Sequence, residues 1–369
     1  MNVMERMAEI GADRKIADFR VKQQQSYEFK VRYAEIRAKE FARECDKRDL
    51  NYHVSVGGLD SITLYLFLRQ IGINAPGISV SHLEDTSIQR IHRQLGITSV
   101  KPYRSKPQVI QEFGFPVLSK ETASKIELLQ NPSPKNATVR HAIITGETGE
   151  YGGNRKNTRM KMSQKWLNLF GGPENENEGV NYQCASFKVS SKCCYYLKEK
   201  PCDDWAKQNN SVPFLGLMAS EGGRRQKSLM IHGCNYFGKS TIRSAPFAIF
   251  NRQDILQLVL DLKVPVPEIY GEIVRDPGGT LRTTKAQRTG CSMCGFGIHL
   301  EKRPHRFDRL YESNPREWDY WMHRCCVDDA GQPFGWGKVL DYIGVRWTPE
   351  TLAEDIAKKN KKKAGKSRT

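Results

Sequence analysis

The sequence lacks any long run of apolar residues, and its mean hydropathy is -0.60. Since a helix needs about 20 consecutive apolar residues to cross a bilayer, we expect no membrane span. The first fifteen residues, MNVMERMAEIGADRK, are charged and lack the apolar segment of a secretory signal. Internal repeats are also missing. These absences predict a cytoplasmic protein without a membrane partner.

The chain has 369 residues, enough to bury a full hydrophobic core in one large domain or two. It contains ten cysteines. In a cytoplasmic protein, cysteines are more often metal or redox ligands than members of a disulfide framework.

The formal net charge is +17. Seven of the cations lie between residues 358 and 368, a tail that contains no acid, and the rest of the chain remains basic. A basic surface suits nucleotides, sulfate-like anions or a nucleic acid. We expect the tail to be a disordered run that adds weak phosphate affinity, although a role in solubility alone explains it equally well.

The stretch YHVSVGGLDSITL, residues 52–64, is the most informative part of the chain. Val54 and Val56 are typical of a short buried strand, Gly57-Gly58 of a sharp turn, and residues 62–71 of a helix. A strand, a glycine turn and a helix start form an anion site, because the backbone can come close to a phosphate and the first N–H groups of the helix point at it.

Polar side chains surround this turn. Ser55 and Ser61 supply hydroxyls, and Asp60 supplies a carboxylate able to hold Mg²⁺. An ordinary βα turn that needs two glycines is the alternative, because short glycine motifs are weak indicators.

Strands and helices alternate after this turn. We expect a second strand over 77–82, a helix over 88–95 and a third extended piece over 100–102. This pattern predicts an α/β fold with a doubly wound, mostly parallel sheet. In such sheets ligands bind beyond the carboxyl ends of the strands, where the Gly57-Gly58 turn and the acidic pair Glu84-Asp85 would both lie.

A second glycine turn follows another expected strand, residues 214–218. It contains Glu221, Arg224 and Arg225. Two arginines beyond a strand end can bind a phosphate or sulfate through paired hydrogen bonds.

The expected domain organisation has four parts. They are an N-terminal helical segment (1–50), a nucleotide-binding α/β domain (51–262), a smaller cysteine-bearing C-terminal part (263–350) and the basic disordered tail (351–369). A helix is expected over 119–130 and a polar linker over 171–178.

Four cysteines form a candidate metal set. Cys193 and Cys194 are adjacent, and Cys291 and Cys294 have CxxC spacing. Four thiolates suit a 4Fe-4S cluster or a structural zinc, and adjacent cysteines fit a cluster better because neighbouring side chains diverge. Alternatively, the adjacent pair is buried as small apolar residues and only the CxxC binds.

In combination these motifs resemble the phosphoadenosine phosphosulfate (PAPS) reductase family, of the adenine-nucleotide alpha-hydrolase or ATP-pyrophosphatase-like superfamily. The resemblance spans about residues 52–345. It includes an SGGxDS-like loop at 55–61, a segment at 243–256 similar to P-L-x-x-W-x-x-x-D-V, and a segment at 283–299 similar to R-T-G-C-x-x-C-x-x-G-x-H.

The resemblance implies roles for individual residues. The phosphates of ATP or a sulfonucleotide, with Mg²⁺, would be held by Gly57, Gly58, Asp60 and Ser61, of which Asp60 and Ser61 would be catalytic. Residues near the adenosine would be Glu84 and Asp85. The phosphate- or sulfate-facing set would be Glu221, Arg224 and Arg225, and the cluster ligands Cys193, Cys194, Cys291 and Cys294.

Two departures from the family pattern bear on activity. Val56 stands where the loop usually begins with serine, and Leu59 replaces a frequent lysine. The C-terminal E-C-G-x-H tail that carries the nucleophilic cysteine of sulfonucleotide reductases has no counterpart here.

Three functions follow from these observations. The first is an ATP-pyrophosphatase-type adenylating sulfur transferase with an iron-sulfur cluster, a nucleic acid as one candidate acceptor and a cysteine desulfurase as one candidate sulfur donor. The second is a reductase of PAPS or adenosine phosphosulfate. The third is a catalytically silent protein that binds a nucleotide or a nucleic acid.

Overall fold

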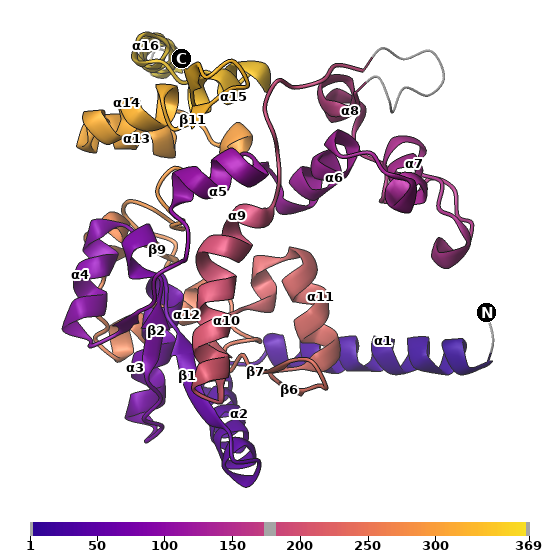
Figure 1. Ribbon diagram of the computed structural model, residues 1–369. Helices are drawn as coiled ribbons and strands as arrows, with labels where there is room; N and C mark the ends of the chain where they lie inside the picture. The colour runs from indigo at the N-terminus through magenta and orange to yellow at the C-terminus, as the bar shows by residue number, and fades with distance from the viewer. Residues whose placement is uncertain (1–2, 173–181, 367–369) are drawn as a thin grey trace. The chain divides into compact units, whose positions relative to one another are not determined.

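The computed structural model of the protein describes residues 3–172 and 182–366, with side chains except those of 3–10, 12, 224 and 359–366. The chain forms two compact units (Figure 1). Unit 1 comprises residues 1–102 and 198–292, and unit 2 comprises residues 103–197 and 293–369. Among the described residues, no helix is long and apolar enough to cross a membrane.

This division differs from the contiguous domains expected from the sequence. The segment 103–197 leaves the α/β unit after its third strand, and the chain returns to that unit at residue 198. The physical reason is that the central strand of the sheet is completed only by residues beyond 210, so one α/β unit is built from two separate segments.

Unit 1 contains a six-stranded sheet with the order β3-β2-β1-β5-β7-β6. Five of its strands run parallel, and only the edge strand β6 is antiparallel to its neighbour β7. The strand bounds are β1 Asn51–Ser55, β2 Gly77–Ser79, β3 Thr98–Ser99, β5 Ser211–Leu215, β6 Asn235–Phe237 and β7 Ile242–Ser244. From β1, the strands that follow it directly lie on one side and β5 and β7 on the other.

The remaining elements of unit 1 are mostly helices. They are α1 Val3–Gln23, α2 Tyr27–Lys47, α3 Leu59–Gln70, α4 Thr86–Gln94, α10 Lys200–Gln208, α11 Gly223–His232 and α12 Arg252–Asp261, with short 3₁₀ turns at Ser81–Leu83, Ala219–Glu221 and Glu268–Tyr270 and the two-stranded ribbon β8 Ile273–Arg275 and β9 Leu281–Thr283.

Helices cover both faces of this sheet. Side chains alternate along β1, so its neighbouring residues pack against helices on opposite faces. Phe214 of β5 contacts Tyr52 of β1 and Phe41 of α2 on one face. His53 points to the other face, where its ring meets Trp205 of α10. Burial lowers the pKa of His53 to about 4, so this side chain is a neutral part of the core at pH 7.

A buried ion pair fixes the N-terminal helices to the rest of unit 1. Lys30 of α2 donates to Asp254 of α12 at 2.8 Å, and both side chains are less than 10% exposed. Asp254 also accepts from the backbone N–H of Asn251, and the Asn251 side chain caps α12 in return. The expected N-terminal helical segment is therefore present and packed.

The expected mixed α/β fold with a mostly parallel sheet is confirmed. The helix expected over 62–71 is α3, which starts three residues earlier at Leu59. The second strand ends at Ser79, because the chain turns there into the 3₁₀ turn Ser81–Leu83. The strand expected over 214–218 is shifted toward the N-terminus, as β5 ends at Leu215.

Unit 2 is mainly helical around its own core. Its elements are α5 Lys106–Phe113, β4 Val117–Leu118, α6 Lys120–Gln130, α7 Ala137–Thr145, α8 Gln164–Phe170, α9 Lys192–Cys194, β10 Gly295–Phe296, α13 Arg306–Ser313, α14 Pro315–His323, β11 Cys326–Val327, β12 Pro333–Phe334, α15 Trp336–Tyr342 and α16 Pro349–Lys366, with short 3₁₀ turns at Pro134–Asn136, Glu150–Gly152 and Ile298–Leu300. Trp336 is fully buried in this core and packs edge-on against Phe115. The short strand β4 pairs with β10, so the two segments of unit 2 are joined.

Three expectations fall in or near segments of unit 2. The helix expected over 119–130 is α6, which Ser119 caps by accepting from the N–H of Thr122. The polar linker expected over 171–178 lies, except for its first two residues, outside the described residues. The segment expected as a disordered tail is helical as far as Lys366, in keeping with its Ala, Glu and Lys content.

Candidate functional site

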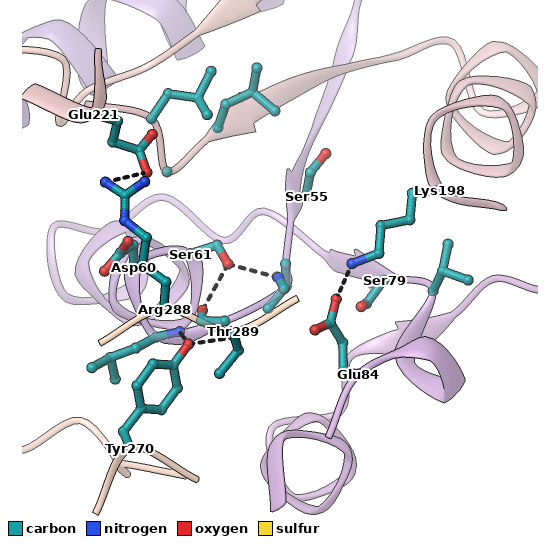
Figure 2. A pocket seen from close by; sticks show the side chains of 18 of the residues that line it. Ser55, Asp60, Ser61, Ser79, Glu84, Lys198, Glu221, Tyr270, Arg288 and Thr289 are labelled. Carbon is teal, nitrogen blue, oxygen red and sulfur yellow. Dashed lines mark hydrogen bonds and ion pairs between the residues drawn. The ribbon is translucent and has the colours of Figure 1, made fainter. Parts of the chain in front are cut away.

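A pocket of about 480 Å³ lies in unit 1 at the carboxyl ends of the parallel strands. Ser55 at the end of β1, Ser79 at the end of β2 and Leu215 at the end of β5 all line it. Because β1 lies where the strand order reverses, the pocket occupies the position at which open parallel sheets bind ligands. Figure 2 shows this pocket from close by.

The turn between β1 and α3 forms part of the pocket wall (Figure 2). Ser61 in the first turn of α3 accepts from the N–H of Gly57 at 2.7 Å and donates to the carbonyl of Gly58 at 2.9 Å. The Ser61 hydroxyl therefore closes the turn. It also occupies a backbone donor that an anion in the pocket could use.

Only glycine fits at position 58, because a side chain there would clash with a neighbouring residue. The φ of Gly58 is −78°, within reach of any residue, but a Cβ here would lie 2.4 Å from the hydroxyl oxygen of Tyr270. The corresponding distance at Gly57 is 3.7 Å, to Oε1 of Glu84, which is ordinary contact. The two glycines thus differ: Gly58 leaves room for the Tyr270 hydroxyl, whereas a Cβ at Gly57 would make only ordinary contacts.

Tyr270 holds the start of α3 from the other side. Its hydroxyl accepts from the backbone N–H of Leu59 at 3.1 Å and lies 2.8 Å from Oγ1 of Thr289 (Figure 2). Burial raises the pKa of Tyr270, so the hydroxyl remains protonated. A close approach of β5 completes the wall, because a Cβ on Gly216 would lie 3.0 Å from Cα of Ser61.

Asp60 faces Arg252 across the pocket. Nη1 of Arg252 donates to Oδ1 of Asp60 at 2.5 Å, and Nη2 of the same arginine donates to the carbonyl of Gln287 at 3.3 Å. Burial raises the pKa of Asp60, while the arginine opposes that rise. One carboxylate oxygen is thus engaged with a cation, as a carboxylate that shares a site with phosphates and Mg²⁺ would be.

Glu221, at the end of the 3₁₀ turn after β5, gathers two further cations. Arg225 lies 3.3 Å from one of its oxygens. Arg288 lies 3.9 Å from the other (Figure 2). Both guanidinium groups are more than half exposed, so an anionic ligand can reach them. The side chain of Arg224, expected to share this role, lies outside the described residues.

Lys198 pairs with Glu84 in the pocket. Its amine donates to Oε1 of Glu84 at 2.5 Å. Burial opposes the charge, but Cys291 and Glu84 outweigh it and raise the pKa of Lys198. The lysine lies in a π-helical turn, Tyr195–Glu199, of a kind that recurs at functional sites.

His92 supports the glycine turn from behind. Its Nε2 donates to the carbonyl of Gly57 at 2.9 Å, and its Nδ1 lies 2.9 Å from the hydroxyl of Ser81. Burial lowers the pKa of His92, so the neutral ring donates at one nitrogen and accepts at the other. The turn is consequently held in place from both sides.

Asp85 has a structural position. It caps α4 by accepting from both the N–H and the hydroxyl of Ser87, and it is not among the residues that line the described pocket. Its neighbour Glu84 does line the pocket. Of the expected acidic pair, the structure brings one member to the site.

The four candidate metal ligands are divided between the two units. Cys291 belongs to unit 1, and Cys193, Cys194 and Cys294 belong to unit 2. All four side chains are thiols outside any disulfide, and thiols are the right donor chemistry for iron or zinc. In the described part of the chain, however, no three His, Cys, Asp or Glu side chains are grouped to hold a metal ion, so the cluster stays a prediction.

Several pocket residues were not singled out from the sequence. They are Ser79, Lys198, Arg252, Tyr270, Arg288 and Thr289. The available signals were the segment at 243–256, which contains Arg252, and the R-T-G-C run, which contains Arg288 and Thr289. Tyr270 and Lys198 lie outside both, and nothing local marks them.

Comparisons with known proteins add no identity to this site. No protein-family model matches the chain, and no curated protein sequence is significantly similar to it.

Proposed function

We propose that unit 1 binds an adenine nucleotide, ATP or a sulfonucleotide, and that the chain is an adenylating sulfur transferase of the ATP-pyrophosphatase type. The observation that supports this most is the pocket itself. A strand–glycine–helix turn, four cations and three carboxylates meet at the carboxyl ends of β1, β2 and β5. The doubly wound fold of the adenine-nucleotide alpha-hydrolases is proposed with it, since helices cover both faces and the strand order reverses at β1.

In this proposal, ligand phosphates replace partners that the pocket residues now give one another. A phosphate oxygen beside the turn would accept from the N–H groups of Gly57 and Leu59, in place of the hydroxyls of Ser61 and Tyr270. Arg252 and Arg288 would neutralise the pyrophosphate, and Asp60 would hold Mg²⁺ through its second oxygen.

The reaction is balanced in two steps. An acceptor oxygen attacks the α-phosphorus of ATP, the bond to pyrophosphate breaks, and the acceptor carries AMP. A sulfur nucleophile from a donor protein then attacks the acceptor carbon or phosphorus. A bond to sulfur forms there, and the bond from that atom to the oxygen that carries AMP breaks, so AMP leaves. A 4Fe-4S cluster on the four cysteines, if bound, would orient or carry that sulfur.

The test is product analysis. Purified protein, ATP and Mg²⁺ are incubated with oligonucleotide or small-molecule acceptors, and AMP and pyrophosphate are quantified by ion-exchange chromatography. Formation of both, abolished in the double variant Arg252→Gln/Arg288→Gln, is expected. If the wild-type protein binds ATP but forms no product with every acceptor tried, the adenylating transferase is contradicted.

The position of Lys198 between the pocket and a candidate ligand cysteine favours a second function, the reduction of PAPS or adenosine phosphosulfate. Lys198 lines the pocket, and the nearby Cys291 helps to raise the pKa of the lysine, so a bound sulfate group and a redox-active sulfur would lie near one cation. Sulfite release in the presence of thioredoxin is the expected sign. Its absence with both nucleotides contradicts the reductase.

Metal content distinguishes the two readings of the cysteines. Protein purified without oxygen is analysed for iron, acid-labile sulfide and zinc. Iron and sulfide of about four each per chain would support the cluster, whereas zinc would make the cysteines a structural site.

A further inference from the structure

The loop after α7 in unit 2 (Figure 1) is held by hydrogen bonds of its own. The N–H of Thr148 donates to the carbonyl of Arg155 at 2.9 Å, and the N–H of Arg155 donates to the Thr148 hydroxyl at 3.0 Å. The amine of the buried Lys125 donates to the carbonyl of Arg159 at 2.9 Å. The backbone is therefore fixed where the arginines emerge.

Four cations stand within seven residues of this loop, and no acid lies among them. They are Arg155, Lys156, Arg159 and Lys161, and all are exposed. Lys156 is 80% exposed and lies 3.6 Å from Glu147. The other three form no ion pair with any side chain that the structure describes. We call these four residues the basic loop surface.

An aromatic side chain stands at the tip of the same loop. Tyr151 has a relative exposure of 107%, more than any other large apolar or aromatic side chain that the structure describes. It belongs to the 3₁₀ turn Glu150–Gly152, between Gly149 and Gly153, so no neighbouring side chain shields it. A tyrosine left in water loses the stabilisation that burial would give, and a flat partner would restore it.

We propose that the basic loop surface and Tyr151 bind single-stranded nucleic acid. Fixed, unpaired cations suit a chain of phosphates, and an exposed ring beside them suits stacking on an unpaired base. A surface kept only for solubility would mix charges of both signs, which residues 155–161 do not. The site lies in unit 2 and does not depend on the chemistry proposed for unit 1.

The test uses the full-length protein and a fluorescein-labelled 20-nucleotide single strand, with anisotropy measured between 50 and 200 mM salt. In the variant Arg155→Ala/Arg159→Ala/Lys161→Ala, the slope of log K against log salt should fall in magnitude by about 2, since each phosphate contact to a single strand contributes about 0.7. Tyr151→Ala should weaken single-strand binding roughly tenfold and leave duplex binding unchanged.

The matched control removes three exposed cations of unit 1, Lys47→Ala/Lys207→Ala/Lys239→Ala, and should keep the wild-type slope. Equal slopes in the two triple variants would overturn the proposal, as would binding to phosphatidylserine vesicles but not to the oligonucleotide. ATP binding is measured in parallel. If the wild-type protein binds the oligonucleotide but not ATP, only the function proposed for unit 1 is contradicted. If it binds ATP but not the oligonucleotide, only this inference is contradicted.

Discussion

The cations of the unit 1 pocket and those of the basic loop surface in unit 2 differ in how their charge is balanced. In the pocket, Arg252 pairs with Asp60, Lys198 pairs with Glu84, and Arg225 and Arg288 flank Glu221. In the loop, only Lys156 has an acidic neighbour among the described residues, at 3.6 Å.

The difference indicates two kinds of ligand. Cations that already have carboxylate partners bind an anion only if its geometry lets it replace those ion pairs with equally good hydrogen bonds. This favours one small ligand with several phosphates. Exposed cations without partners attract any chain of phosphates and release its counterions. The same residue types therefore predict selective binding of one ligand in unit 1 and binding of many phosphate chains in unit 2.

The largest effect should come from the substitution that disrupts the built pocket, Gly58→Ala. The new methyl group would lie 2.4 Å from the Tyr270 hydroxyl, so the tyrosine must leave the N–H of Leu59. We expect nucleotide binding, measured by calorimetry, to weaken roughly a hundredfold, because the methyl group and the displaced tyrosine overpack the wall of the pocket. Oligonucleotide binding should not change.

Two further variants test this reason. In Gly58→Ala/Tyr270→Phe the clashing oxygen is absent, and the remaining neighbours of the methyl group are Oγ1 of Thr289 at 3.1 Å and a ring carbon at 3.7 Å, so part of the free energy of unfolding that Gly58→Ala loses should return. Gly57→Ala, with 3.7 Å of space, should keep the free energy of unfolding within about 0.5 kcal/mol of wild type. Failure of the tyrosine variant to restore any stability would refute the steric explanation.

Removal of the cation opposite Asp60 should have the next largest effect. Arg252→Gln deletes a charged hydrogen bond at 2.5 Å and a ligand for phosphate, and we expect about thirtyfold weaker ATP binding. Arg90→Gln is the control, because Arg90 pairs with Glu268 at an exposed site outside the pocket. Similar losses in both variants would mean that general charge, and not the pocket, sets the affinity.

A smaller effect is expected for the coupling between Lys198 and Glu84. A double-mutant cycle of Lys198→Gln and Glu84→Gln, measured by urea unfolding, should give a coupling energy of about 1–2 kcal/mol, because the Glu84 side chain is only 6% exposed. The same cycle on Arg90 and Glu268, which are both more than half exposed, should give less than about 0.5 kcal/mol. Equal values would remove the distinction between pocket and surface pairs.

The smallest expected change is in the salt dependence of ATP binding. Because the pocket cations are partly buried and paired, the affinity for ATP should fall only about threefold between 50 and 200 mM salt. Three phosphate contacts on the basic loop surface should cost the oligonucleotide roughly tenfold or more over the same range. Two parallel salt curves would show that both ligands use the same kind of surface.

The residues that the sequence places at the turn after the first strand all line the pocket, and their signals are local. Gly57, Gly58, Asp60 and Ser61 are consecutive or nearly so, and the change from strand to helix is visible in their neighbours. Glu221 and Arg225 follow the next strand end in the same way, and both line the pocket. Asp85, which the sequence places beside Glu84 at the site, caps α4 and is not among the lining residues of the described pocket, because an acidic residue before a helix serves equally well as its cap.

The residues that sequence patterns did not reveal reach the site across long separations. Tyr270 contacts Leu59 over 211 positions, and Lys198 contacts Glu84 over 114. No periodicity or motif carries such information, since it arises only when β5 takes its place beside β1. For the same reason the insertion of 103–197 into the α/β unit was not predictable from composition.

The pairing of β1 with β5 also has a consequence for biosynthesis. β1 leaves the ribosome some 160 residues before β5, a delay of roughly 10 to 30 s at ordinary elongation rates. During that time one edge of a central strand has no partner and is open to wrong pairing. Unit 2 is interrupted in the same way, because β4 is synthesised long before its partner strand β10. Neither unit can therefore finish folding before the other has largely been synthesised, and a nascent chain released early would present an unpaired strand to the cell's chaperones.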